Sequence, residues 1–212
     1  MIKACLFDFD GTLVDSMPVW GRKMFRILEM TGIPVPDGLL RTLTPLGDQG
    51  TAAYFRTTLN VPMTDEEMFA AMDEYALPRY REEIPAKEGV ADYLAHLKAS
   101  GVGIYLLTAS PHRMFEPCLQ RTDLWKYFDA CWCCDDFGMV KSNPAIYHAA
   151  AQRIGVKPEE LMFFDDNRGA VETAVRAGLV TVGVYDPSSA ADEQDIRAIA
   201  HRYIHNMREM LP

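Results

Sequence analysis

Long hydrophobic runs are missing from this chain. No stretch reaches the roughly 18 apolar residues of a membrane span, and the first apolar run is short and ends in aspartates, unlike a secretory signal. Basic residues are also scarce: 21 lysines and arginines stand against 30 aspartates and glutamates, for a formal net charge of −9. This balance argues against nucleic acid or an anionic membrane as the main partner. We therefore expect a cytoplasmic protein.

Cysteines are few, and their spacing does not build a metal cluster. A structural zinc site needs two Cys-x2-Cys pairs at a distance, and only Cys131 and Cys134 have that spacing. We interpret the cysteines as reduced core thiols, three of them in a run that resembles a buried strand. The five are Cys5, Cys118, Cys131, Cys133 and Cys134.

What the chain does have is a regular alternation of strand-like and helix-like segments. Apolar, strand-like runs lie at 2–9, 103–108, 130–134, 161–164 and 180–184. Between them, apolar residues recur at helical spacing over 90–100, 113–122, 145–154 and 170–177. This alternation predicts an α/β fold, a doubly wound, Rossmann-like parallel sheet whose ligands bind at the carboxyl ends of the strands.

Residues 15–85 interrupt this rhythm and are predicted to form an inserted helical cap. Helices are expected at 19–30, 48–59 and 65–80, and Thr64 with Glu67 forms the capping-box pattern that begins the last of them. The core then comprises 1–14 and 86–212. Its tail is predicted to contain a helix near 196–200, a short edge strand at 203–204 and a last helical turn.

Two aspartates end the first strand-like run, in the order Phe7-Asp8-Phe9-Asp10-Gly11. Residues i and i+2 of a strand point to the same side, so both carboxylates could converge as the chain leaves the sheet. Their repulsion is relieved by protonation or by a cation, and an oxygen-only pocket suits Mg²⁺. Asp-Gly is also common in turns and calcium loops, but this pair follows an apolar run and no glutamate stands at the calcium-loop spacing.

Three further positions follow predicted strands. Thr108 and the N–H of Ala109 could hold a phosphate, although Thr108 alone could be a cap or turn residue. Lys141 could place an ammonium beside a carboxylate, although a single loop lysine is usually solvated. Asp165 and Asp166 are consecutive carboxylates, and burying one is expensive without a metal or another partner.

In this order, the four blocks resemble the haloacid dehalogenase-like hydrolase superfamily over essentially the whole chain. The family's first block, hhhDxDGT, matches the segment from Phe7 to Thr12, and its Thr or Ser at a strand end matches Thr108. Its lysine matches Lys141, which is followed by Ser-Asn-Pro where Pro-x-Pro is usual. Its acidic pair matches 165–166, followed by Asn-Arg.

The resemblance implies a Mg²⁺-dependent reaction on a small phosphate ester. Asp8 would be the nucleophile that forms an aspartyl-phosphate, and Asp10 would protonate the leaving oxygen and then activate water. One oxygen of Asp8, the backbone carbonyl of Asp10 and Asp166 would hold the metal, with Asp165 ligating it or orienting its waters.

The resemblance also assigns the phosphate contacts and the subclass. Thr108 and the N–H of Ala109 would bind phosphoryl oxygens, and Lys141 would orient the nucleophile and offset charge in the transition state. Dehalogenases of this group lack the second aspartate and transport ATPases carry Thr there, so a carboxylate at 10 implies a phosphohydrolase or phosphomutase. A helical insertion between the first two motifs resembles the cap of enzymes that act on small soluble phosphates.

The leading interpretation is therefore a phosphatase of a small phosphorylated metabolite. A phosphomutase resembling beta-phosphoglucomutase is the alternative within the fold, and a catalytically silent binding or scaffold protein is the alternative from another class. Candidate specificity residues in the cap are Arg22, Lys23, Arg41, Gln49 and Arg56. The sequence does not define the substrate or the oligomeric state.

Overall fold

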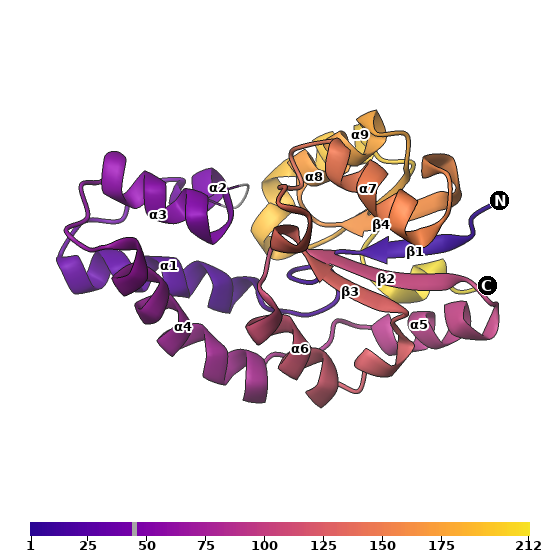
Figure 1. Cartoon of the computed structure of the whole chain (residues 1–212), viewed down its shortest axis with the longest axis horizontal. Helices are drawn as coiled ribbons and strands as arrows, with labels where there is room; N and C mark the ends of the chain where they lie inside the picture. The colour runs from indigo at the N-terminus through magenta and orange to yellow at the C-terminus, as the bar shows by residue number, and fades with distance from the viewer. Residues whose placement is uncertain (44–45) are drawn as a thin grey trace.

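The computed structural model describes residues 1–43 and 46–212, apart from the side chain of Arg41 (Figure 1). Its centre is a six-stranded sheet in the order β3-β2-β1-β4-β5-β6, and every neighbouring pair is parallel. The predicted doubly wound α/β fold is thus confirmed. The strands are β1 (Ala4–Phe7), β2 (Gly103–Thr108), β3 (Ala130–Cys133), β4 (Leu161–Asp165), β5 (Val180–Val184) and β6 (Arg202–Ile204).

Helices cover both faces of this sheet because alternate strand residues point to opposite sides. Cys5 and Phe7 of β1 pack with α5 and α6 in one hydrophobic cluster, and Ala4 and Leu6 pack with α7 and α8 in another. Figure 1 shows α5 and α6 below the sheet and α7, α8 and α9 above it. Their bounds are α5 (Val90–Ala99), α6 (His112–Arg121), α7 (Ala145–Ile154), α8 (Arg168–Arg176) and α9 (Glu193–Ile199).

Four helices lie together beyond the carboxyl ends of the strands, on the left in Figure 1. They share a hydrophobic cluster of their own, which includes Met24, Phe55 and Met72. The chain enters and leaves this group at adjacent points, where the N–H of Asp15 donates to the carbonyl of Pro85 at 3.0 Å. The helices are α1 (Met17–Thr31), α2 (Leu39–Leu43), α3 (Gly47–Thr57) and α4 (Asp65–Glu82).

Most predicted segments are found, with differences that have physical causes. Strand β1 is shorter than the predicted 2–9, because the chain turns out of the sheet after Phe7. The run at 130–134 was expected to be buried, but β3 is an edge strand and its first three residues are half-buried. Helix α2 was not anticipated. Strand β6 lies at the other edge, as predicted, and all five cysteines are free thiols.

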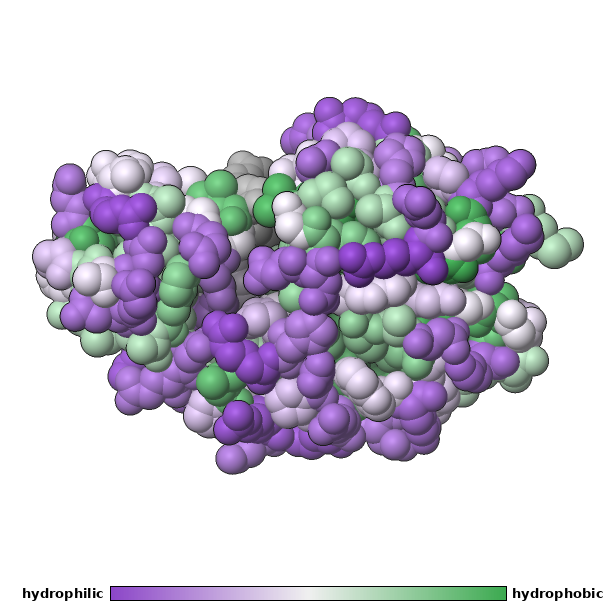
Figure 2. All heavy atoms as spheres, in the orientation of Figure 1, coloured by the Kyte–Doolittle hydropathy of each residue, from purple (hydrophilic) through white to green (hydrophobic). Residues whose placement is uncertain are grey.

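Short 3-10 segments complete the chain. In the parts that the structure describes, no helix is both long enough and apolar enough to cross a membrane. The face in Figure 2 is largely hydrophilic, with apolar side chains in small groups between charged ones. The 3-10 segments are η2 (Trp125–Tyr127), η3 (Cys134–Phe137), η4 (Pro158–Glu160), η5 (Pro187–Asp192) and η6 (Met207–Met210).

The capping box at the start of α4 is confirmed. The backbone N–H of Thr64 donates to Glu67 Oε2 at 2.8 Å, and the N–H of Glu67 donates to Thr64 Oγ1 at 3.2 Å. Two N–H groups of the first helical turn therefore have side-chain partners. The other end of α4 reaches the site described below.

Replacing Thr64 by alanine removes one of these two bonds. We expect the Thr64→Ala variant to lose about 1 kcal/mol of unfolding free energy, the usual contribution of an N-cap side chain. Urea unfolding monitored by circular dichroism measures the change. Thr58→Ala, an exposed substitution of the same size, should stay within about 0.5 kcal/mol of the parent; equal effects of the two variants would contradict the role of the cap.

Candidate active site

A tight turn after β1 brings the first motif to the sheet edge. The N–H of Asp8 still donates to the carbonyl of Phe164 in β4, at 2.9 Å. Gly11 then adopts φ +75°, and a Cβ built on it would lie 2.7 Å from Asp166 Oδ2. A side chain at position 11 is thus excluded by conformation and by space. The same turn directs the hydroxyl of Thr12 to Asp166 Oδ1, at 3.2 Å.

Three buried carboxylates meet at this edge. One oxygen each of Asp8, Asp165 and Asp166 lies within 4.8 Å of the others. The ammonium of Lys141 forms an ion pair with Asp8 Oδ1 and a second with Asp165 Oδ2 at 2.8 Å. The structure therefore brings together four of the residues that the sequence singled out, from the ends of two strands and from the loop after η3.

Ionisation of the carboxyl groups in this cluster is unfavourable. Burial raises the pKa of Asp8 to about 8, with Asp165 and Asp10 adding to the rise and Lys141 opposing it. Burial, together with Asp165 and Asp8, also raises the pKa of Asp166 well above its ordinary value. Lys141 has a raised pKa despite its burial because Asp165 and Asp8 stabilise its charge. One ammonium does not balance three carboxylates.

The donor set fits a hard divalent cation. Three carboxylates converge, their oxygens are close enough to share one ion, and their mutual repulsion would be relieved by it. Zinc would be expected to recruit nitrogen or sulfur ligands. The carboxyl group of Asp10 is not part of this cluster of three.

Asp10 is held instead by three hydroxyl groups. Its Oδ1 accepts hydrogen bonds from Ser16 Oγ and Tyr80 Oη, both at 2.6 Å, and its Oδ2 accepts one from Ser110 Oγ at 2.5 Å. Burial, followed by the charge of Asp10, raises the pKa of Tyr80 well above its ordinary value, so the phenol stays protonated and donates. Asp10 thus has a fixed orientation in an environment unlike that of Asp8.

The sequence did not identify these three hydroxyl residues. Ser110 stands two residues after Thr108, and Ser16 starts the first cap helix, so both had a weak local signal. Tyr80 had none, because only the packing of α4 against the core brings it to Asp10.

At the end of β2, Thr108 is turned away from the cavity that the next two residues line. Thr108 is fully buried, and its Oγ1 accepts the N–H of Ser110 at 3.0 Å, which is the turn role left open above. Ala109 and Ser110 line a cavity of about 320 Å³. Asp8, Lys141 and the acidic pair line its inner part.

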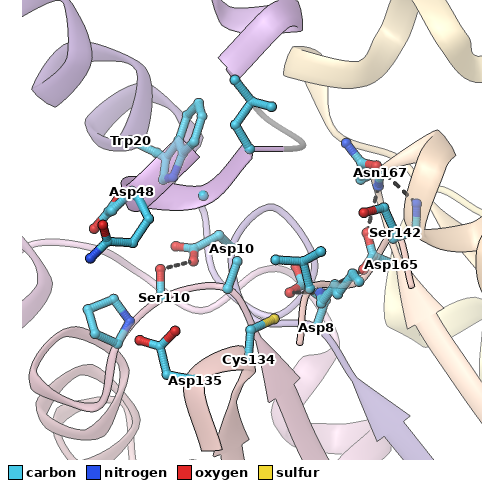
Figure 3. A pocket seen from close by; sticks show the side chains of 18 of the residues that line it. Asp8, Asp10, Trp20, Asp48, Ser110, Cys134, Asp135, Ser142, Asp165 and Asn167 are labelled. Carbon is cyan, nitrogen blue, oxygen red and sulfur yellow. Dashed lines mark hydrogen bonds and ion pairs between the residues drawn. The ribbon is translucent and has the colours of Figure 1, made fainter. Parts of the chain in front are cut away.

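The outer part of the cavity is lined by four elements. Trp20 comes from α1, Asp48 and Gln49 come from α3, and Arg113 and Asp135 come from α6 and η3. Figure 3 shows Trp20 and Asp48 across the cavity from Asp8. Of these five residues, the sequence singled out only Gln49, because the others carry no motif and meet only through the fold.

The other cap candidates lie elsewhere. Arg22 pairs with Glu29 on the exposed side of α1, at 2.8 Å, and Arg56 forms an exposed ion pair with Asp65. Lys23 of α1 is buried and pairs with Asp48 of α3. The side chain of Arg41 lies outside the described residues.

Comparison with known proteins decides the family. A family model described as haloacid dehalogenase-like hydrolase matches residues 2–178. The chain belongs to this family. Its hydrolases generally use Mg²⁺, in agreement with the carboxylate cluster.

The similar curated proteins are phosphatases. A phosphoglycolate phosphatase of Salmonella choleraesuis is 31% identical and is matched over 92% of this chain and 88% of its own length. A phosphorylated carbohydrates phosphatase of Thermotoga maritima is 28% identical over 84% of this chain and 82% of its own. The chain is thus a phosphatase of the haloacid dehalogenase-like family.

Solved structures share the fold over the whole chain. CbbY from Rhodobacter sphaeroides in complex with phosphate has a TM-score of 0.85 at 24% identity, covering 100% of this chain and 97% of that one. A putative beta-phosphoglucomutase from Thermotoga maritima has a TM-score of 0.72 at 26% identity, covering 99% and 97%.

The strained cluster predicts an unusual pH dependence of stability without divalent cations. A folded-state pKa of about 8 for Asp8 lies above the ordinary value of 3.8, so the folded state binds more protons between these limits. Its stability should then fall as pH rises through this window. We expect the melting temperature in chelator to drop from pH 6 to pH 8, where ordinary carboxylates no longer titrate.

The matched variants are Asp166→Asn, which removes one carboxylate of the cluster, and Asp37→Asn, which removes an exposed one. Asp166→Asn should weaken the dependence, because it removes a second carboxyl group whose pKa is raised by burial and by Asp165, whereas Asp37→Asn should leave it as in the parent. An equal slope in all three proteins would show that the cluster does not cause it. Differential scanning calorimetry gives the melting temperatures.

Proposed function

We propose that this phosphatase hydrolyses the monoester of a small phosphorylated metabolite through an aspartyl-phosphate on Asp8. The observation that carries the proposal is the buried cluster of Asp8, Asp165 and Asp166 with Lys141, at the inner end of a cavity. A nucleophile, a cation site and a fixed positive charge then stand at the place where a phosphoryl group would bind.

Mg²⁺ would be held by Asp8, Asp166 and the backbone carbonyl of Asp10, with Asp165 ligating it or orienting its waters. When bound, it would offset the negative charge of nucleophile and phosphoryl group. Lys141 opposes the rise in the pKa of Asp8 and orients its carboxyl group through their ion pair. The N–H of Ala109, on the cavity wall, is available to phosphoryl oxygens, and Thr108 shapes this turn through Ser110.

In the first step, an Asp8 oxygen attacks phosphorus and the bond from phosphorus to the leaving oxygen breaks. Asp10 donates its proton to that oxygen, so the product leaves as an alcohol. In the second step, Asp10 takes a proton from water as the water attacks phosphorus. The bond to Asp8 breaks, inorganic phosphate is released, and both side chains return to their initial states.

The cap contributes to both steps. We propose that 15–85 form a cap on the core of 1–14 and 86–212 and that it closes over the bound ester to exclude bulk water. Two observations support this division: the helices of 15–85 have a hydrophobic cluster of their own, and the chain enters and leaves this segment at residues that are hydrogen-bonded to each other, Asp15 and Pro85. Tyr80 and Ser16 bond to Asp10, so the position of the cap also sets the orientation of the acid.

A phosphomutase is the second candidate, supported by the likeness to the putative beta-phosphoglucomutase. Both reactions share the first step and differ in the acceptor of the phosphoryl group: water in the phosphatase, a second hydroxyl of the sugar phosphate in the mutase. A fate experiment with labelled phosphate separates them.

Replacing the nucleophile tests the proposal. We expect the Asp8→Asn variant to lose at least 10³-fold in turnover of phosphate esters with Mg²⁺, because an amide does not attack phosphorus. Release of inorganic phosphate from a panel of esters measures the loss. The Asp37→Asn variant, prepared in the same way, should keep the parent activity.

Three other outcomes would point to a different function or to a substrate outside the panel. Label that moves within the sugar phosphate without release would establish a mutase. Mg²⁺ that raises the melting temperature without turnover would indicate a narrow substrate outside the panel. Neither turnover nor a response to Mg²⁺ would favour a silent binding or scaffold protein.

The hydroxyl from the cap gives a second test. We expect Tyr80→Phe to lower kcat about tenfold with little change in KM, because one hydrogen bond that orients Asp10 is lost while the substrate contacts remain. Steady-state kinetics on the best ester of the panel measures both constants. Tyr93→Phe is the matched control, since Tyr93 is a buried tyrosine beneath the sheet. A rise in KM alone would contradict this role of Tyr80.

A further inference from the structure

The outer part of the cavity, like the inner part, is lined by more carboxylates than cations. We call it the leaving-group end and define it by Trp20, Asp48, Gln49, Arg113 and Asp135. An ester bound with its phosphoryl group at Asp8 would extend its leaving group into this end. Figure 3 shows Asp135 and Asp48 on two sides of this space, with Ser110 between them.

The arginine of this end is already matched. The Nε and Nη2 atoms of Arg113 donate to the two carboxylate oxygens of Asp73 in α4, at 2.7 and 3.0 Å. This bidentate pair uses one whole edge of the guanidinium. The pKa of Arg113 is raised, chiefly by its bond to Asp73, and the nearby charges of Asp48 and Asp135 add to the rise. A second anion would have to compete with these three carboxylates.

The lysine of the cap is also unavailable. Lys23 is only 1% exposed, and its ammonium pairs with Asp48 Oδ1 at 2.8 Å, behind the cavity wall. Asp135, in contrast, is exposed on the wall and makes no side-chain hydrogen bond or ion pair with any described residue. Among the side chains that the structure describes, this end therefore offers one carboxylate without an ion pair of its own, whereas its arginine is already paired with Asp73.

We infer that the leaving group is neutral and carries hydroxyl groups, and that the site rejects esters with a second phosphate or a carboxylate. This inference rests on the proposed phosphatase function and names its substrate class, the monophosphate of a sugar or polyol. A second anion would lose its hydration and would be repelled by Asp135 and Asp48, while the only guanidinium of this end that the structure describes is already paired with Asp73.

The remaining walls suit a neutral polyol. Trp20 and Phe69 present apolar surface to the cavity, which can pack against the C–H faces of a sugar. The amide of Gln49 and the hydroxyl of Ser110 can exchange hydrogen bonds with hydroxyl groups, and Asp135 can accept them.

Two matched substrate pairs test this inference. Glycerol 3-phosphate and 3-phosphoglycerate differ in a hydroxymethyl group against a carboxylate, and fructose 6-phosphate and fructose 1,6-bisphosphate differ in one phosphate. We expect kcat/KM with Mg²⁺ to be at least tenfold higher for the neutral member of each pair. Phosphoglycolate, which has a carboxylate on its leaving group, should be as poor as the anionic members.

A charge change on the wall tests the cause. Asp135→Asn keeps a hydrogen-bond acceptor but removes the charge. We expect it to reduce the ratio of kcat/KM for the neutral member to kcat/KM for the anionic member at least threefold in each pair. Asp135→Lys should narrow it further by raising kcat/KM for the anionic members. Glu159→Gln, the same loss of charge at an exposed position on η4, should leave every ratio unchanged.

The outcomes separate this inference from the function beneath it. Failure of every ester to exceed the Asp8→Asn background would overturn the phosphatase proposal itself. Hydrolysis in which phosphoglycolate or another anionic ester is equal or better would overturn the inference and leave the phosphatase standing. Unchanged ratios in both Asp135 variants would also overturn it, because the proposed source of the selectivity would have no effect.

Discussion

The structure depends on holding three carboxylates together at one buried sheet edge. Their repulsion opposes folding, and one lysine offsets only part of it. The fold supplies smaller compensations from rigid backbone: the N–H of Asn167 donates to Asp165 Oδ1 at 2.7 Å, and the turn at Gly11 places Thr12 on Asp166. A bound cation would offset the negative charge that Lys141 alone does not neutralise.

The same edge separates two aspartates that are close in sequence. Asp8 stays hydrogen-bonded to the sheet through its N–H and faces Lys141, whereas Asp10 has left the sheet and faces hydroxyl groups. Strand alternation suggested that both carboxylates would converge on one point. That argument fails here because β1 ends at Phe7, before the pair. Two environments for two carboxylates allow two different roles, as attack and proton transfer require.

The core was predictable because its signals are local. Strands β2 and β5 and helix α7 have the expected bounds, since each is an uninterrupted apolar or periodic run. Helix α2 was missed because five residues contain barely one helical turn. The run at 130–134 gave the right strand but the wrong burial, because sequence does not show which strand lies at an edge.

The candidate site also has a part that sequence motifs predict and a part that they do not. Its inner part could be predicted from motifs, because the three carboxylates around Lys141 each end or directly follow a strand. Arg113, Asp135 and Tyr80 had no such signal. Arg113 belongs to a helix whose pattern indicates only packing, and its partner Asp73 is 40 residues away in α4. Such residues acquire a function only when two separate parts of the chain are brought together.

This division bears on how far a relative's substrate can be transferred. The phosphoryl group is the same in every monoester, so the chemistry proposed for Asp8 would constrain the inner part of the cavity whatever the substrate. The leaving-group end has no such constraint. Its arginine, Arg113, is paired with Asp73, and Lys23, behind its wall, is paired with Asp48. Loss of one of these carboxylates would release a positive charge beside the substrate and leave the phosphoryl end untouched. Preference for neutral or anionic esters can therefore change by single substitutions in this fold, and identity over the whole chain does not report it.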